Sequence, residues 1–440
     1  MTLRAVLCTY SATLTIGLCQ PGSIDTSFVA APVSGGFALT VQPDGKILVG
    51  GGGITRLNTD GSSDTNFNAA VDGQVWSIAV QNDSKILIGG LFGTVNGTNR
   101  ANVARLNPNG ALDDAFLPAT IPSGAYVFSV VPQPDGLILI GGEFATVGGI
   151  SRRGIARLTG NGTLDAFFNP GTGVPSPGVT DSVRCIALQD DGRVLIGGLF
   201  PSFNGTPRSN FARLNSDGSS DTNFVALPGP DGFVYSIAIQ PDAAILLVGG
   251  FTKVHNQPNS HVARLQSNGQ LDGTFDGGSG VTDLLGINMV TSVKLQGNGD
   301  IIIGGGFATV RGLQRNGIAK LHSNGTLDMD FVPATPNRSQ AYVLTLQPDS
   351  KVIVSGSEGL LRLDNFPPGI QPATLSLATY AGLSIQGTVG GRYRIEYSTD
   401  ADTNVWTFLE NLILPRSPYL FIDSQPTTQP RRFYRALTAP

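Results

Sequence analysis

Carboxylates and histidines are the side chains of this sequence that have the chemistry for acid–base catalysis or metal binding. Asp181, Asp231 and Asp283 lie in irregular segments that precede apolar runs. A glycosidase needs two converging carboxylates of this kind. The three histidines are scattered along the chain and show no spacing typical of a zinc or copper site. One catalytic hypothesis therefore stays open, a secreted glycosidase-like hydrolase with a pair of aspartates.

Motifs with a known catalytic mechanism are otherwise missing from the sequence. We find no serine-hydrolase elbow, phosphate-binding loop or dinucleotide fingerprint, and no helical pattern follows the glycine run at 50–53. Cys185 takes a strand position that Ser77 takes elsewhere, which favours a small packed side chain over a nucleophile. Enzymatic activity is uncertain on this basis, and the sequence favours a protein without it.

The composition indicates an all-β chain with many tight turns. Of the 440 residues, 58 are glycine and only 14% are charged, against about 25% charged in ordinary globular proteins. A net charge of −4 argues against nucleic acid or an anionic membrane as a partner. Three cysteines are too few for a disulfide framework. Since no segment has the ~18 continuous apolar residues of a membrane helix, we expect no membrane insertion.

The N-terminus has features of a secretory signal. Within residues 1–19, Arg4 precedes an apolar stretch that ends near Cys19, as in a short signal peptide. We therefore expect residues 1–19 to be a signal peptide and the protein to be secreted or to lie at the cell surface.

A recurring motif shows how the rest of the chain is organised. One copy reads ARLNPNGALDDAF at 104–116, and near-copies begin at residues 156, 212, 263 and 319. The repeated unit has about 50 residues, a period typical of solenoids and propellers. In each unit, apolar runs such as WSIAVQ (76–81) and ILIGG (86–90) alternate with Asp-Gly or Asn-Gly pairs. This pattern predicts four antiparallel strands joined by tight type I′ hairpins.

The two ends of the repeat array complement each other. Seven segments resemble a first strand with its turn and seven have an Asp-x-x-Phe ending, but the two sets are offset. One ending, GSIDTSF at 22–28, precedes every first strand, and the last unit has three strands and no ending. Pairing these two pieces closes a ring without an open sheet edge. We therefore predict a seven-bladed β-propeller over residues 20–365, closed by an N-terminal outer strand.

The repeat is similar to a known family. The patterns PDGKILVGG (43–51), LILIGGEFATVGG (137–149) and ARLNxDGSxDxxF resemble the delta-60 repeats of large secreted or surface proteins of bacteria. The resemblance covers residues 22–365 and implies a β-propeller with an extracellular location. It implies no general activity. Kelch repeats have a similar period, but their downstream tyrosine and tryptophan pattern is missing here.

A second domain is expected after the array. Residues 366–373 are rich in proline, which indicates a linker. Residues 374–440 alternate as β-strands, and the motif from Tyr393 to Asp400, with Trp406 and the RFYR run at 432–435, is similar to a small β-sandwich module that ends secreted proteins of Verrucomicrobia-like bacteria. The resemblance implies a separate β-sandwich. Its aromatic residues either form the core of so small a domain or stack on a sugar.

One basic residue and one aspartate recur in every blade. The basic residues are Arg56, Arg105, Arg157, Arg213, Arg264, Lys320 and Arg362. The aspartates are Asp25, Asp64, Asp113, Asp165, Asp221, Asp272 and Asp328. Seven equal copies in a chain so poor in charge favour a structural ion pair in each blade over a ring of ligand sites.

Two of the turns resemble calcium loops. Segments 58–64 and 215–221 place oxygen atoms at alternate positions around a glycine. The other copies have asparagine instead of the central aspartate, which leaves one carboxylate in each loop. Because a tight hairpin explains the Asn-Gly and Asp-Gly pairs equally well, the sequence favours no cofactor and no metal, with calcium as the alternative.

Ligand contacts are expected where the first strands begin. The residue at this position is aromatic in five blades, as Phe37, Trp76, Phe128, Tyr235 and Tyr342, and it is Arg184 or Thr291 in the other two. Packing between blades explains such residues, and a binding rim is the alternative. Long connecting segments gather on the same face, where loops on a rigid frame often carry binding. The candidate binding residues are Trp76, Tyr126, Asp181, Arg184, Tyr235, Asp283 and Tyr342.

The first and last blades lack a loop that the other blades have. Elsewhere the Gly-Gly pair is followed by Phe-x-x-x-x-Gly, as at 92–97. These two blades are neighbours in a closed ring, so we expect a notch on the loop face. The sequence as a whole predicts a non-catalytic extracellular binding or adhesion scaffold that holds a protein or glycan on this face. The alternative is the hydrolase, with its aspartate pair at the channel mouth.

Overall fold

The described part of the chain consists of strands, turns and irregular connections. The computed structural model describes residues 20–33, 35–175, 181–225, 228–276, 281–282, 289–335, 340–365, 382–385, 392–398, 407–413, 419–422 and 433–438. These contain no helix, and therefore none that is long and apolar enough to cross a membrane. The all-β prediction is confirmed. Contacts divide the chain into two units, 1–372 and 373–440, and the expected signal and linker segments lie outside the described residues.

The described part of the first unit has eight three-stranded antiparallel sheets. Seven of them are built from the long strands of the repeat, and we number these as blades one to seven. Blades one to four are β1 (Ala38–Val41), β2 (Ile47–Gly51) and β3 (Gly53–Leu57); β4 (Gln74–Val80), β5 (Ile86–Leu91) and β8 (Val103–Leu106); β9 (Tyr126–Pro132), β10 (Ile138–Glu143) and β13 (Ile155–Leu158); and β14 (Ser182–Leu188), β15 (Val194–Leu199) and β18 (Phe211–Leu214). Blades five to seven are β19 (Val234–Ile239), β20 (Ile245–Gly249) and β23 (Val262–Leu265); β25 (Met289–Leu295), β26 (Ile301–Gly306) and β29 (Ile318–Leu321); and β30 (Ala341–Leu346), β31 (Val352–Gly356) and β32 (Gly359–Leu363).

Short hairpins extend five of the blades. They are β6 (Thr94–Val95) with β7 (Thr98–Asn99), β11 (Thr146–Val147) with β12 (Ile150–Ser151), β16 (Ser202–Phe203) with β17 (Thr206–Pro207), β21 (Lys253–Val254) with β22 (Gln257–Pro258), and β27 (Thr309–Val310) with β28 (Leu313–Gln314), which β24 (Val281–Thr282) joins. In blades one and seven, the second strand turns directly into the third.

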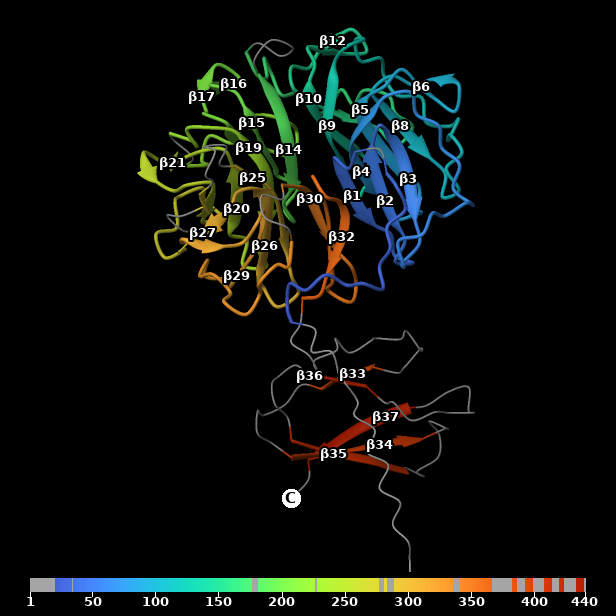
Figure 1. Cartoon of the computed structure of the whole chain (residues 1–440), viewed down its shortest axis with the longest axis vertical. Helices are drawn as coiled ribbons and strands as arrows, with labels where there is room; N and C mark the ends of the chain where they lie inside the picture. The colour runs from blue at the N-terminus through green and yellow to red at the C-terminus, as the bar shows by residue number, and fades with distance from the viewer. Residues whose placement is uncertain are drawn as a thin grey trace, which may run out of the picture. The chain divides into compact units, whose positions relative to one another are not determined.

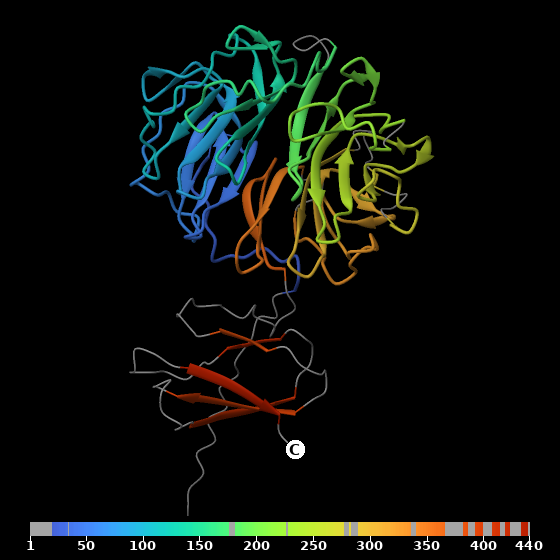
Figure 2. The same cartoon turned by 180° about the vertical axis from the view of Figure 1, so that it is seen from behind.

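The sheets form a closed circle. The first strand of each sheet contacts the first strand of the next, from β1 and β4 onward, and β30 contacts β1. Figure 1 shows the blue sheet of β1–β3 beside the orange sheet of β30–β32, and Figure 2 shows the same arrangement from behind. The first strands therefore line the centre of the ring, which in a propeller is a channel.

Apolar side chains pack between neighbouring blades. One cluster joins Leu195 and Phe211 of blade four to Val234 of blade five. Another joins Leu39 of blade one to Ile353 of blade seven, and so completes the circle. Full burial of each large side chain stabilises the fold by about 1.5–3 kcal/mol. Both faces of each sheet are covered in this way, which explains the continuous apolar runs of the second strands.

The Asp-x-x-Phe endings form one bridge each, so the prediction of a fourth strand in each blade is wrong. Leu106 bridges Leu112 in blade two, and single bridges recur in the other blades. The chain then turns, because Asp113 Oδ1 accepts a hydrogen bond from the Ala115 N–H at 3.1 Å. An aspartate that bonds the backbone two residues later bends the chain away from the sheet.

The N-terminal segment closes the ring in the same manner. Ile24 bridges Leu363 at the edge of β32. The Asp25 N–H donates to the Arg362 carbonyl oxygen at 2.9 Å, and the Asp364 N–H donates to the Ser23 carbonyl oxygen at 2.9 Å. Blade seven therefore receives its ending from the start of the chain.

The turns differ from the predicted type I′ hairpins. At Asn107–Ala111, Gly110 has φ +90° but Asn109 has no positive φ, whereas type I′ requires positive φ at both central residues. The Asn109 side chain instead accepts the Ala111 N–H at 3.1 Å. The result is a three-residue turn in which only the glycine is left-handed.

The described residues of the second unit form two small antiparallel sheets. One pairs β33 (Gly382–Ile385) with β36 (Tyr419–Ile422), and the other places β34 (Arg392–Ser398) between β35 (Thr407–Ile413) and β37 (Phe433–Thr438). Ile395 and Glu396 are buried. Asp400 and Trp406 lie outside the described residues, and the β-sandwich stays a prediction.

Candidate functional site

A β-bulge near the start of each first strand from β4 to β30 sets the geometry of the site. In blade two the register with β5 shifts between Val75 and Ser77, so Trp76 has no partner in the sheet. The other bulged residues are Phe128, Arg184, Tyr235, Thr291 and Tyr342. Phe37, just before β1, holds the equivalent position. A bulge re-aims a side chain, and we call these seven residues the bulge ring.

The repeated Gly-Gly pair makes room for the bulge. A Cβ atom on Gly90 would lie 1.9 Å from the Gln74 carbonyl oxygen of the bulged strand. A Cβ atom on Gly89 would lie 2.8 Å from Val127 of the next blade. The second glycine therefore permits the bulge, and the first permits close packing between blades.

Aromatic members of the bulge ring contact one another across blades. The Phe37 and Trp76 rings stack with centroids 4.4 Å apart, and Phe128 meets Trp76 edge-on at 5.9 Å. Tyr342 lies 6.4 Å from Phe37 across the seam of the ring, and its side chain is 41% exposed. Tyr126 stacks on Phe128 at 5.5 Å. The structure thus brings three predicted binding residues, Trp76, Tyr126 and Tyr342, into one aromatic arc.

Arg184 extends this arc as a cation. Its guanidinium carbon lies 3.9 Å above the centroid of the Phe128 ring, a cation–π contact. Its Nε donates a hydrogen bond to Ser182 Oγ at 3.0 Å. Burial lowers the pKa of Arg184, and the nearby Glu143 carboxylate opposes this shift. Tyr235, whose pKa burial raises, is also close enough to interact electrostatically with Arg184.

The predicted aspartates have different environments. Asp231 accepts hydrogen bonds from the Thr252 N–H at 2.6 Å, Thr252 Oγ1 at 2.8 Å and the Lys253 N–H at 2.9 Å. Burial alone would raise the pKa of Asp231, but these bonds lower it, whereas a catalytic acid needs a raised pKa. Asp181 is buried next to β14, and Asp283 lies outside the described residues.

The repeated charges meet within each blade. The closest N–O distances are 2.7 Å for Arg56–Asp64, Arg105–Asp113, Arg157–Asp165 and Arg264–Asp272, 2.9 Å for Arg213–Asp221, 3.2 Å for Lys320–Asp328 and 2.8 Å for Arg362–Asp25. The arginines also reach the next blade, as Arg105 does with the Gly160 carbonyl oxygen at 2.7 Å. Each arginine therefore connects its own aspartate to the neighbouring blade.

The carboxylates of the calcium-like loops are engaged by the protein. Asp60 Oδ1 accepts hydrogen bonds from the Ser62 N–H at 2.9 Å and from Ser62 Oγ at 2.7 Å, and these bonds lower the pKa of Asp60. Asp64 binds both Arg56 and Lys46. The carboxylate of Asp60 therefore shapes the turn, and that of Asp64 belongs to the ion pair with Arg56 and Lys46.

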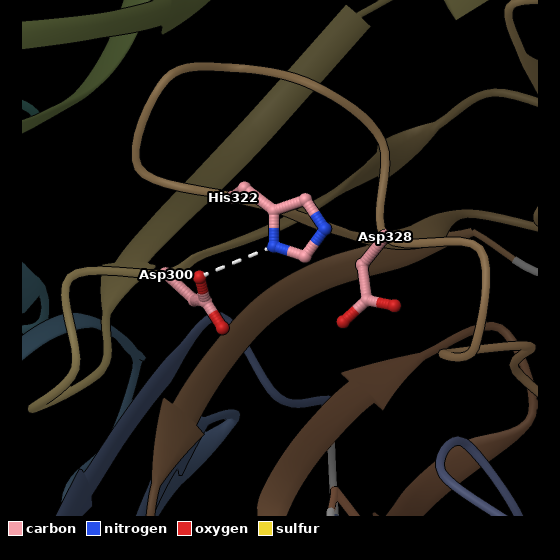
Figure 3. Close-up of side chains that lie close together, drawn as sticks. All are labelled: Asp300, His322 and Asp328. Atoms are coloured by element: carbon pink, nitrogen blue, oxygen red, sulfur yellow. Dashed lines mark ion pairs between the residues drawn. The ribbon is translucent and has the colours of Figure 1, made fainter.

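Blade six departs from this pattern. Asp300, His322 and Asp328 place potential metal ligands within 4.8 Å of one another, the one such group among the described residues (Figure 3). The Lys320 Nζ, however, lies 3.3 Å from an Asp300 oxygen and 3.2 Å from an Asp328 oxygen. An ammonium group already pairs with both carboxylates, so a divalent ion would have to displace it.

Hollows in the surface lie at the other end of the first strands. One is lined by Gln81, Asn82, Pro132 and Gln133. Each first strand is followed by a glutamine, at 42, 81, 133, 189, 240, 296 and 347, and several of these accept a bond from the blade arginine, as Gln42 does from Arg56 at 3.4 Å. Our sequence reasoning missed this set, although its identity in all seven units was visible. Equal copies of a neutral residue suit a structural role.

Seven sheets around a common centre define the chain as a repeat-based β-propeller. The family model described as "Domain of unknown function (DUF5122) beta-propeller" matches residues 42–67, 81–116, 133–168, 189–224, 240–275 and 296–331. These six matches support a repeat-based β-propeller. No curated protein matches it.

Solved structures include similar propellers. The WD40 β-propeller domain of Doa1 is 15% identical with a TM-score of 0.52, over 78% of this chain and 95% of that one. Virginiamycin B lyase from Staphylococcus aureus is 16% identical with a TM-score of 0.49, over 76% and 96%. PorZ from Porphyromonas gingivalis is 11% identical with a TM-score of 0.49, over 90% and 56%. At 15% identity, the likeness to the Doa1 domain shows the fold alone.

Proposed function

We propose that this chain is a non-catalytic extracellular binding scaffold, which holds a protein or glycan at the mouth of the channel formed by the bulge ring. One observation carries the proposal. The same backbone bulge carries four aromatic side chains and one arginine from five blades, Phe37 holds the equivalent position in blade one, and aromatic rings of neighbouring blades contact one another. Aromatic side chains and arginine are the residues that contribute most to binding energy in protein interfaces.

The bulge position differs in kind from the structural positions of the repeat. The Arg–Asp pairs and the glutamines are nearly identical in seven copies, as packing between equivalent blades requires. The bulge ring contains Phe, Trp, Tyr, Arg and Thr on equivalent backbone. This variation gives the ring a polar side and an aromatic side, and a binding site needs such asymmetry.

The notch gives a ligand access to the aromatic side. Blade one passes from β2 to β3 through Gly52, and blade seven passes from β31 to β32 through Ser357 and Glu358, whereas the other five blades carry hairpins at this point. Phe37 and Tyr342 belong to these two blades. An exposed aromatic patch beside a missing loop is typical of an interaction site.

The extracellular location rests on two features of the sequence, the expected signal at residues 1–19 and the resemblance to repeats of secreted and surface proteins. The hydrolase alternative lacks support from the described residues. Asp231 is held ionised by three hydrogen bonds to the loop that follows β20, which suits an anchor for that loop.

Binding by the full chain tests the proposal. A glycan array and a pull-down identify a ligand, and affinities are then measured for Tyr342→Ala, Trp76→Ala and the control Phe167→Ala. Phe167 is 85% exposed and lies outside the bulge ring. We expect the first two variants to bind at least about tenfold more weakly, as truncated hot spots do, and the control to be unchanged. Ligand binding that survives both changes would place the site elsewhere.

A further inference from the structure

The first strands carry an unusual set of charges. Over all seven of these strands, the charged residues are Arg184 and Lys294, both cations. The Lys294 side chain has solvent-accessible surface, although Val293 beside it is buried, and burial among the surrounding strands lowers the pKa of its amine. Because neighbouring blades cover both faces of the sheet, the solvent that Lys294 reaches is that of the channel. The channel wall therefore attracts anions, in a protein with net charge −4.

Arg184 lacks the partners that the other repeat arginines have. Arg105 has a carboxylate at 2.7 Å and a carbonyl oxygen of the next blade at 2.7 Å. Within the described part of the chain, Arg184 has the Ser182 hydroxyl and the Phe128 ring, and no carboxylate oxygen within 4.0 Å. A partly buried guanidinium without a counter-ion is costly in free energy. A ligand that brings a carboxylate would offset this cost.

The guanidinium is also held in a fixed orientation. Phe128 contacts the flat face of the guanidinium and Ser182 accepts the hydrogen bond from Nε. The edge with the two terminal nitrogens is therefore the one that can receive a ligand. A planar fork of this kind matches the two oxygens of a carboxylate. Little side-chain entropy is lost when the ligand binds, because the side chain is already ordered.

The surroundings of Arg184 indicate what carries the carboxylate. The phenol groups of Tyr126 and Tyr235 lie in the electrostatic neighbourhood of Arg184, and Trp76 contacts the Phe128 ring on which the guanidinium rests. Tyrosine rings can pack against a sugar ring and hydrogen-bond to its hydroxyl groups, while the single guanidinium pairs with one carboxylate. This combination suits a sugar unit that carries one carboxylate. The carboxylate of an acidic peptide is carried on a flexible alkyl stem, which offers no ring face to pack on these aromatic walls.

We infer that the bulge ring binds acidic glycans through a uronate carboxylate received by Arg184. This inference rests on the proposed binding function and names the ligand class of the same site. Among the described residues, Glu143 at the end of β10 is the one carboxylate with an electrostatic influence on Arg184, and it competes with the ligand for the positive potential. Its removal therefore strengthens binding, whereas loss of Arg184 weakens it.

The test uses the full chain and isothermal titration at neutral pH and low salt. The probes are oligogalacturonate, its methyl-esterified counterpart, free galacturonic acid and a poly-glutamate peptide. We expect oligogalacturonate to bind at least about tenfold more tightly than the ester, since a charge-assisted contact is lost. The free acid should bind more weakly than the oligomer, and the affinity of the oligomer should fall as salt is added.

The variants assign the contact to residues. Arg184→Gln should weaken binding of oligogalacturonate at least about tenfold, and Arg184→Lys should also weaken it because a lysine lacks the planar fork. Glu143→Gln should tighten binding by about two- to fivefold. Lys253→Gln, which removes an exposed cation of the β21 hairpin, should change binding less than twofold. Thermal melts check that each variant is folded.

The outcomes separate the two proposals. If Arg184→Gln leaves binding unchanged, or the ester binds as well as the acid, the uronate inference is wrong. If poly-glutamate binds and oligogalacturonate does not, the ligand class is wrong. If Tyr342→Ala abolishes binding of some other ligand while Arg184→Gln does not, the binding function stands and this inference fails. If no ligand depends on either residue, both proposals fail.

Discussion

Replacing Asp25 with alanine tests how the ring is closed. Asp25 binds Arg362 and Lys351 of blade seven at distances of 2.8 and 2.5 Å. The Asp25 and Arg362 side chains are only 8% and 10% exposed. Asp25 Oδ1 also accepts a bond from the Ser27 N–H at 2.9 Å. The substitution therefore leaves a buried guanidinium without its counter-ion at the seam of the ring.

The expected loss of stability follows from burial. Removing one partner of a buried ion pair costs about 3–5 kcal/mol, and we take about 3–4 kcal/mol because the pair lies near the surface. With an unfolding entropy of about 2.1 cal/mol/K per residue over the 372 residues of this unit, the Tm should fall by about 4–5 °C. Differential scanning calorimetry of the full chain measures this shift.

Asp64→Ala is the matched control. Asp64 binds Arg56 at 2.7 Å and Lys46 at 2.8 Å with similar burial, but its arginine is 8 residues away whereas that of Asp25 is 337 residues away. Both variants should lose similar stability, and only Asp25→Ala should expose residues 20–31 to limited proteolysis. A Tm change below about 1 °C, or equal protection of this segment in both variants, would refute the role of the pair in closure.

Further expectations concern acid, glycine packing and the thiol. The hydrogen bond from Lys46 holds the pKa of Asp64 at about 2, below its ordinary 3.8. The contribution of Asp64 to stability is therefore complete above about pH 4 and is lost as the pH falls toward 2. The Tm of Asp64→Ala should depend less on pH over this range than that of the unchanged protein. Gly90→Ala places a Cβ atom 1.9 Å from a carbonyl oxygen and should destabilise the chain by about 1–3 kcal/mol in urea unfolding, whereas Gly273→Ala, with nothing within 4 Å, should not. Burial raises the pKa of the Cys185 thiol, so peptide mapping should find it unmodified by maleimide at pH 8 in the folded protein and modified in urea.

The propeller could be predicted because the order of strands and endings in the repeated units shows how the two ends of the array pair. The orphan segment at 22–28 and the incomplete last unit complement each other, and the bridge of Ile24 with Leu363 is the contact this offset requires. The fourth strand and the type I′ turns were wrong for a shared reason. Side chains of Asp113 and Asn109 bond the backbone two residues later, and alternation of apolar residues carries no information about such local bonds.

The candidate site was only partly readable from the sequence. Alignment of the units gave the position of Trp76, Arg184 and the other ring members. It did not give the bulge, whose register shift comes from pairing with the Gly-Gly strand. Nor did it give the environment of Arg184, because Phe128 and Glu143 belong to the preceding blade. Contacts between blades depend on the three-dimensional ring, which one unit does not contain.

Two kinds of position can be distinguished in the repeat. Some carry the same residue in every blade and build the fold, whereas the bulge position varies from blade to blade. Blades two to seven hold their bulge with the same register shift although the bulged side chain is aromatic, arginine or threonine. The backbone therefore tolerates an exchange at this position. Arg184→Phe should accordingly keep its Tm within about 2 °C, a change of the size usual for a substitution outside the core.

The same variant should lose binding of oligogalacturonate, because it keeps the aromatic arc and removes the cation that receives the carboxylate. The melt and the titration are made on one protein preparation. A variant that melts more than about 5 °C lower would show that Arg184 supports the fold, and the distinction between frame and binding positions would then not hold for blade four.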